Sequence, residues 1–144
     1  MSERHDSHST ECQRQMLKKW KSESWNDTPI SKDIFLTSCS SNWPAPDGAM
    51  YDPKNKLAIG IEFKPDTESK SGIQKGIGQS VTYLNKFSAS YFIIPKKVEG
   101  FKIANYTKKL SNNKIKGKLP IGLIGYDIDA EKRISIERLV DIDV

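Results

Sequence analysis

The chain has 144 residues and a formal net charge of +5, with 36% hydrophobic and 28% charged residues. This is the length of one domain, and it suffices for a hydrophobic core. No apolar run approaches the ~20 residues that span a bilayer, and the first residues lack the pattern of a secretion signal. Cys12 and Cys39 lie far apart, which argues against a disulfide framework or a thiolate zinc site. We therefore expect an intracellular, cytoplasmic protein with no membrane partner, consisting of a flexible tail at 1–10 and a single domain at 11–144.

A first helix is predicted from Thr10 to about Ser24. Thr10 and Gln13 have the spacing of a capping box, in which the side chain of each residue bonds the backbone of the other. The apolar stripe that would face the core repeats every four residues and consists of Cys12, Met16 and Trp20. Residues 34–37 then have the composition of a strand, the first of the sheet.

The most informative stretch is a short apolar run at 57–63, preceded by the turn sequence Asp-Pro-Lys-Asn at 52–55. This pattern predicts a buried strand that is reached through a hairpin. Side chains two residues apart share a face of a strand, so Glu62 and Lys64 project together while Phe63 packs on the other side. A carboxylate and an amine at the end of a buried strand are costly unless they pair or hold a metal ion.

A hairpin turned at 52–56 returns Asp47 to the level of Glu62 and Lys64. Two carboxylates beside a lysine form a site for a hard cation, and oxygen ligands with retained waters suit Mg²⁺. A metal-bound water, activated with help from the lysine, can attack a phosphodiester while the metal stabilises the developing charge. The alternative is a surface Asp47 beside an ordinary ion pair between Glu62 and Lys64.

These residues resemble the signature of the PD-(D/E)xK nuclease superfamily, which includes restriction endonucleases, Holliday-junction resolvases and RecB-type exonucleases. The matching residues are Pro46-Asp47, followed by Glu62-Phe63-Lys64. The resemblance implies that Asp47, Glu62 and the carbonyl of Phe63 bind Mg²⁺, for which Mn²⁺ can substitute. It also implies that Lys64 positions and activates the attacking water.

A second helix is predicted from about Gly72 to Phe87. Its apolar stripe is expected to include Ile73, Ile77, Val81 and Leu84. Gly76 and Gly78 each cost ~1 kcal/mol in a helix interior. Their presence there indicates the close approach of another backbone or of a ligand.

Gln79 and Tyr83 of this helix match the Gln-x-x-x-Tyr signature that follows Glu-x-Lys in RecB-type nucleases and in the motor subunits of type I restriction enzymes. The resemblance implies that Gln79 reaches the active site and orients the nucleic acid or the attacking water. Gln79 falls roughly opposite the apolar stripe, so it reaches a buried site only if the helix is covered on two sides. The alternative is a solvent-facing Gln79.

The rest of the chain is predicted to form a buried strand at 89–95, a helix at 101–112, and strands at 119–126 and 133–137. With the earlier elements, the order is that of the αβββαβ core of the same superfamily. The resemblance therefore implies a restriction-endonuclease-like α/β fold, in which helices flank a mixed β-sheet.

Positive charge is concentrated in the segment 96–118, which has eight lysines and the single acid Glu99. Such a segment can follow a phosphate backbone, although a solvated lysine-rich face is an equally ordinary interpretation. With one lysine of the second helix, the residues expected to bind nucleic acid are Lys75, Lys96, Lys97, Lys108 and Lys109.

We expect a Mg²⁺-dependent endonuclease that hydrolyses phosphodiester bonds of DNA, of restriction, repair or recombination type. Its catalytic residues would be Asp47, Glu62, Lys64 and Gln79. Two alternatives use the same fold, namely a non-catalytic nucleic-acid-binding module and a toxin domain that cleaves RNA. A third is a structural protein with coincidental motifs, in which Asp47 lies far from Glu62. Because no recognition domain is visible, we expect a homodimer or one subunit of a larger nuclease assembly, such as a restriction-modification system.

Overall fold

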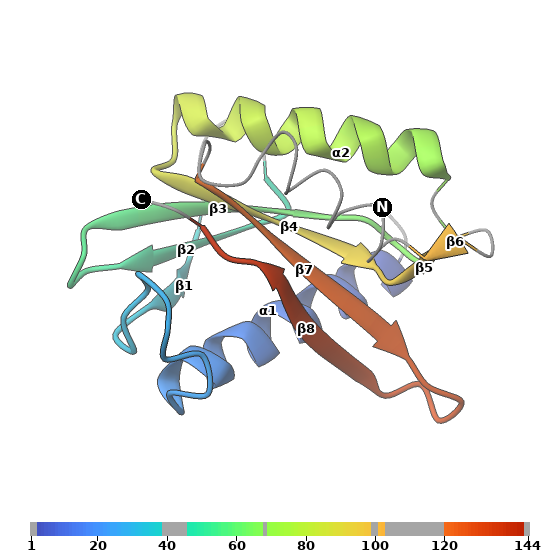
Figure 1. Ribbon diagram of the computed structural model, residues 1–144, viewed down its shortest axis with the longest axis horizontal. Coiled ribbons are helices and arrows are strands. Elements are labelled where there is room, and N and C mark those ends of the chain that lie inside the picture. Colours follow the sequence, from blue (N-terminus) through green and yellow to red (C-terminus); the bar gives the residue numbers. More distant parts are fainter. Residues whose placement is uncertain (1–2, 39–45, 68, 99–100, 103–119, 143–144) are drawn as a thin grey trace.

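The computed structural model describes residues 3–38, 46–67, 69–98, 101–102 and 120–142. In this part of the chain, a six-stranded sheet lies between two helices (Figure 1). Helix α1 (Glu3–Lys21) covers one face of the sheet, and helix α2 (Lys70–Thr82) covers the other. None of the described helices is long and apolar enough to cross a membrane.

The sheet has the strand order β1-β2-β3-β4-β7-β8. The strands are β1 (Phe35–Thr37), β2 (Gly48–Asp52), β3 (Leu57–Phe63), β4 (Ala89–Pro95), β7 (Ile121–Ile128) and β8 (Ile134–Val140). The central strands β3, β4 and β7 are parallel, whereas β2 and β8 are antiparallel to their inner neighbours, and β1 is antiparallel to β2. This confirms the mixed α/β sheet and the chain order helix, three strands, helix, strand.

The sheet is buried on both faces, which explains why β3, β4 and β7 have nearly continuous apolar sequences. Alternate residues of β3, including Ile61 and Phe63, join the core that contains Met16 and Trp20 of α1. On the α2 side, a second apolar cluster consists of Ile73, Phe92, Ile94 and Leu123. Phe63 therefore packs away from Glu62 and Lys64, as the alternation along the strand predicts.

Helix α1 begins at Glu3, so the predicted capping box at Thr10 is wrong. The buried side chains of Ser9 and Gln13 hold this part of the helix on the sheet. Gln13 Nε2 donates to Ser9 Oγ at 3.0 Å, and a Cβ on Gly48 would lie 2.2 Å from Gln13 Oε1. Polar packing of this kind leaves no apolar periodicity in the sequence. The division of the chain into tail and domain at residue 10 stays a prediction, but residues 3–10 are helical.

Helix α2 begins earlier than predicted and presents a different face to the sheet. The Ser69 side chain caps it by accepting from Gly72 N at 3.1 Å, and a 3₁₀ turn at Tyr83–Asn85 follows it. The buried residues of these elements are Ile73, Gly76, Ser80 and Tyr83. Val81, which we expected to be in the core, is 41% exposed. The small residues Gly76 and Ser80 let the helix approach the sheet closely, and a search for large apolar side chains does not detect such a face.

The segment after β4 also differs from the prediction. Two short antiparallel strands, β5 (Lys97–Val98) and β6 (Phe101–Lys102), form a separate ladder. The predicted helix at 101–112 therefore does not begin at residue 101. The remainder of that predicted helix lies outside the described residues.

The β2–β3 hairpin is held by Asp52, which is fully buried. Its carboxylate accepts from Ser31 N at 2.8 Å and from Asn55 Nδ2 at 2.9 Å. Burial alone would raise the pKa of Asp52, but the hydrogen bonds from Ser31 and Asn55 outweigh it and lower the pKa below its ordinary 3.8. The ionised carboxylate therefore stabilises the fold above the ordinary pKa, and this contribution is lost as the pH falls through the lowered value.

We expect Asp52→Ala to lower the free energy of unfolding by about 2–3 kcal/mol at pH 7, because several buried donors lose their acceptor. Urea unfolding at pH 7 and pH 3 measures the effect. Asp52→Asn, which keeps one acceptor oxygen, should lose less stability at pH 7. Between pH 7 and pH 3, the free energy of unfolding should decrease less in both variants than in the wild type. An Asp52→Ala protein as stable as the wild type at pH 7 would contradict this account.

Candidate active site

The β2–β3 hairpin brings Asp47 beside Glu62. The register pairs Gly48 with Ile61, so the preceding Asp47 lies opposite Glu62. Two hydrogen bonds fix this arrangement, since Asp47 N donates to Ile61 O and Phe63 N donates to Asp47 Oδ2, both at 2.8 Å. A protein with coincidental motifs would have these carboxylates far apart, and the structure does not.

Glu62 is only 5% exposed, and three groups surround its carboxylate. The Tyr83 hydroxyl donates to Oε1, and the Lys64 ammonium lies 3.4 Å from Oε2. Burial raises the pKa of Glu62, and the nearby charge of Asp47 raises it further. The contacts with Tyr83 and Lys64 lower it, without reversing the net increase. Two carboxylates thus lie close together in a place where their negative charge is not fully compensated.

Lys64 follows β3 directly, and hydrogen bonds fix both its backbone N–H and its carbonyl group. Its backbone N donates to Ile93 O at 3.0 Å, and the Tyr126 hydroxyl donates to its carbonyl at 2.8 Å. Its side chain, 14% exposed, passes under α2 at Gly76, where a Cβ would lie 2.9 Å from Lys64 Cε. Gly76 therefore permits a close approach, but of the side chains of Phe92 and Lys64 and not, as predicted, of another backbone or a ligand. The same prediction is wrong for Gly78, because a Cβ there would meet nothing within 4 Å.

Gln79 lies on α2 one turn after Gly76 and one turn before Tyr83. Because the buried face of α2 is rotated relative to the prediction, Gln79 lies at the flank of this face and not opposite to it. Its Oε1 is buried and has no hydrogen-bond partner in the described part of the chain. A buried acceptor without a partner costs about 1–3 kcal/mol, which a bound cation, water or ligand would offset.

The lysines expected to bind nucleic acid have different surroundings. Lys96 lies 2.7 Å from Glu137 and 3.5 Å from Asp127, so its charge is largely compensated within the protein. Lys75 and Lys97 are exposed. The other two, Lys108 and Lys109, lie outside the described residues.

The sequence analysis assigned no role to the hydroxyls of Tyr83 and Tyr126. The first orients the Glu62 carboxylate, and the second fixes the backbone of Lys64. Tyr83 belongs to the Gln-x-x-x-Tyr signature, so its importance had a signal in the sequence. Tyr126 lies in an apolar strand, where nothing distinguishes it from a core residue.

The chemistry of this cluster fits a cation that retains part of its water shell. Among the described residues, no three His, Cys, Asp or Glu side chains form a group suited to a metal ion. Mg²⁺, however, usually takes only one or two carboxylates and keeps several waters. Asp47 and Glu62 provide that number, and their mutual repulsion would be relieved by a divalent cation.

No protein-family model matches the chain, and no curated protein matches its sequence. Among solved structures, the chain is similar to SfsA of Pyrococcus furiosus, determined in complex with Ca²⁺. The TM-score is 0.45, the sequence identity is 13%, and the match covers 94% of this chain. The chain spans 65% of the length of SfsA. Similarity at this level assigns neither a family nor a function.

Proposed function

We propose that the chain is a metal-dependent nuclease that hydrolyses phosphodiester bonds of DNA. The observation that supports this proposal is the convergence of Asp47, Glu62 and Lys64 at the end of the central strand β3, beneath α2. The αβββαβ order of the elements agrees with the nuclease resemblance of the same residues. The match of residues concerns side chains, and the order of the elements concerns the backbone.

In this proposal Asp47 and Glu62 hold Mg²⁺, with the Phe63 carbonyl as a further ligand. When bound, Mg²⁺ would polarise the phosphate and make a bound water more acidic. The Tyr83 hydroxyl keeps the Glu62 carboxylate in one orientation, so that its second oxygen faces Lys64. Pre-organisation of this kind avoids a reorganisation cost during the reaction.

Lys64 would position the attacking water and stabilise the negative charge that develops on the phosphate. The contact of its Cε with Gly76 and its backbone hydrogen bonds limit the positions of its ammonium group. Gln79 would direct its buried oxygen to the water or to a metal-bound water, which would satisfy that oxygen.

A cleavage assay on supercoiled plasmid tests the proposal. We expect the wild type to nick or linearise the plasmid with Mg²⁺ or Mn²⁺ and to be inactive in EDTA. Asp47→Asn should lose at least about 100-fold of the rate, because a lost metal ligand removes several kcal/mol of transition-state stabilisation. The exposed Asp33 provides a matched control, and Asp33→Asn should cleave like the wild type. Cleavage that persists in EDTA, or that is equal in Asp47→Asn, would contradict the proposal.

A further inference from the structure

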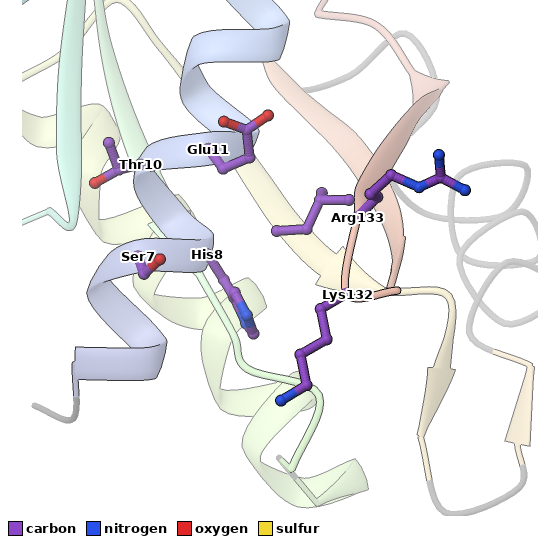
Figure 2. Close-up of a pocket in the computed structure, with 7 residues that line it drawn as sticks. Ser7, His8, Thr10, Glu11, Lys132 and Arg133 are labelled. Carbon is purple, nitrogen blue, oxygen red and sulfur yellow. The ribbon is translucent and has the colours of Figure 1, made fainter. Parts of the chain in front are cut away.

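A second feature of the molecule is a groove between α1 and the turn that joins β7 to β8 (Figure 2). It has a volume of about 790 Å³ and is lined by Ser7, His8, Thr10, Glu11, Lys132, Arg133 and Ile134. Gln15 Nε2 donates to Ile134 O at 2.7 Å and joins the two walls. This groove shares no residue with the cluster around Glu62.

Most charges in the groove are compensated, but that of Lys132 is not. Arg14 donates to Glu11 at 2.7 and 2.8 Å, and Arg133 contacts Asp129 at 2.9 Å. Lys132 has no ion-pair partner among the residues that the structure describes. The groove therefore presents one cation that is not compensated, which favours an anionic ligand.

His8 adds a polar group that faces this cation. Figure 2 shows the imidazole pointing from α1 toward Lys132, whereas the guanidinium of Arg133 points away from the helix. Nδ1 of His8 is buried and lacks a hydrogen-bond partner within the described residues. An ammonium and an imidazole that face each other across a groove form a suitable pair of donors for a phosphate oxygen.

The turn holds Lys132 in an unusual backbone conformation. Its φ is 63°, in the left-handed region that residues other than glycine rarely adopt. Lys132 N donates to Asp129 O at 2.9 Å, and the Asp129 side chain accepts from Arg133 N at 2.8 Å. These hydrogen bonds within the turn fix the position from which the Lys132 side chain leaves the backbone.

The groove and the candidate active site lie at the same edge of the sheet. Strands β3, β4 and β7 are parallel, so the turn after β7 is at the edge where β3 ends at Phe63. The groove lies on the face of the sheet that α1 covers, whereas Glu62 and Lys64 lie beneath α2 on the other face. A nucleic acid bound at the active site would therefore reach the groove by passing around this edge of the sheet.

We propose that this groove, through Lys132 and His8, binds a backbone phosphate of the DNA substrate away from the bond that is cut. The inference rests on the proposed function for its ligand, but it concerns affinity and not the chemical step. It assigns to this chain a phosphate contact at a lysine that was not among those expected from the sequence to bind nucleic acid.

The test is the affinity of the protein for a fluorescent duplex DNA in EDTA, measured by anisotropy at several salt concentrations. The key variant is Lys132→Asn, since asparagine tolerates a positive φ. Lys56→Asn is a closely matched control, because Lys56 is also exposed in a hairpin turn and has a φ of 55°. Lys56 precedes β3 and lies at the opposite edge of the sheet.

We expect Lys132→Asn to weaken binding by about 3–10-fold at 0.1 M salt and to reduce the slope of log K against log salt by ~0.9, as the loss of one phosphate contact predicts. Lys56→Asn should change neither quantity. His8→Gln should weaken binding and leave the salt slope unchanged. Equal effects of Lys132→Asn and Lys56→Asn, no effect of Lys132→Asn, or a wild type that does not bind the duplex would overturn the inference. If the variants change DNA binding as expected but the protein does not cleave DNA, the phosphate site in the groove is supported and the proposed nuclease activity is refuted.

Discussion

Replacing Glu62 by glutamine is expected to lower the rate of Mg²⁺-dependent cleavage by at least about 100-fold. The loss of rate follows from the removal of one of two carboxylate ligands, which is worth several kcal/mol in the transition state. The pH dependence of the stability follows from the raised pKa of Glu62, whose cause is burial beside Asp47. A carboxylate with a raised pKa binds its proton more tightly in the folded state, so its ionisation opposes folding.

The raised pKa of Glu62 also predicts how the free energy of unfolding changes with pH. In the wild type, the Glu62 contribution to the free energy of unfolding decreases as the pH rises from the ordinary pKa of 4.5 through the raised value. Glutamine does not ionise, so Glu62→Gln lacks this decrease. Urea unfolding at pH 4 and pH 8 compares the two proteins. Glu23→Gln, at an exposed position, is the control for both assays. A Glu62→Gln protein that cleaves at the wild-type rate would refute the assigned role.

The second large effect is expected from Gly76→Ala. A Cβ at this position would lie 2.4 Å from Phe92 Cζ and 2.9 Å from Lys64 Cε. Phe92 is fully buried and cannot move away, so overpacking costs about 1–3 kcal/mol, of which helix propensity recovers ~1 kcal/mol. The displaced Lys64 ammonium should lower the cleavage rate by more than about 10-fold, since small misplacements of a catalytic group are costly.

Gly78→Ala is the matched control for this variant, two residues away in the same helix. A Cβ there meets nothing within 4 Å, so the substitution should stabilise the protein by up to ~1 kcal/mol and leave cleavage unchanged. Thermal unfolding and plasmid cleavage, measured on both variants, separate the two positions. If Gly76→Ala is as stable and as active as Gly78→Ala, the contact between α2 and Lys64 has no functional importance.

The parts of the structure that depend on local alternation were predictable from the sequence. The run at 57–63 gave the central strand, and its turn residues gave the hairpin. Alternation placed Glu62 and Lys64 on one face and Phe63 on the other, and the hairpin length placed Asp47 beside Glu62. Each of these inferences uses spacing of a few residues, where backbone geometry leaves few alternatives.

The errors occurred where tertiary packing uses polar or small side chains. Helix α1 begins at Glu3, and the buried residues Ser9 and Gln13 in it do not contribute to an apolar stripe. The buried face of α2 is marked by Gly76 and Ser80, which a search for large apolar residues passes over. The contacts of Gln13 with Gly48 and of Gly76 with Phe92 join residues that are distant in the chain, and no periodicity in a single sequence encodes them.

Electrostatic roles were equally difficult to predict. Lys96 is part of a lysine-rich segment, yet Glu137 and Asp127 from the far end of the chain compensate its charge. Lys132 stands beside acidic residues in the sequence, yet its charge is not compensated within the described structure. The number of lysines in a segment therefore says little about which of them remain available to a nucleic acid.

The central claim is that Asp47 and Glu62 share one divalent cation, and a calorimetric titration of Mn²⁺ into the purified protein tests it most directly. The account predicts that the wild type binds the ion at a site that Asp47→Asn and Glu62→Gln each weaken by at least about 10-fold, whereas Asp33→Asn leaves it unchanged. A wild type that binds no Mn²⁺, or variants that bind it as tightly as the wild type does, would contradict the account.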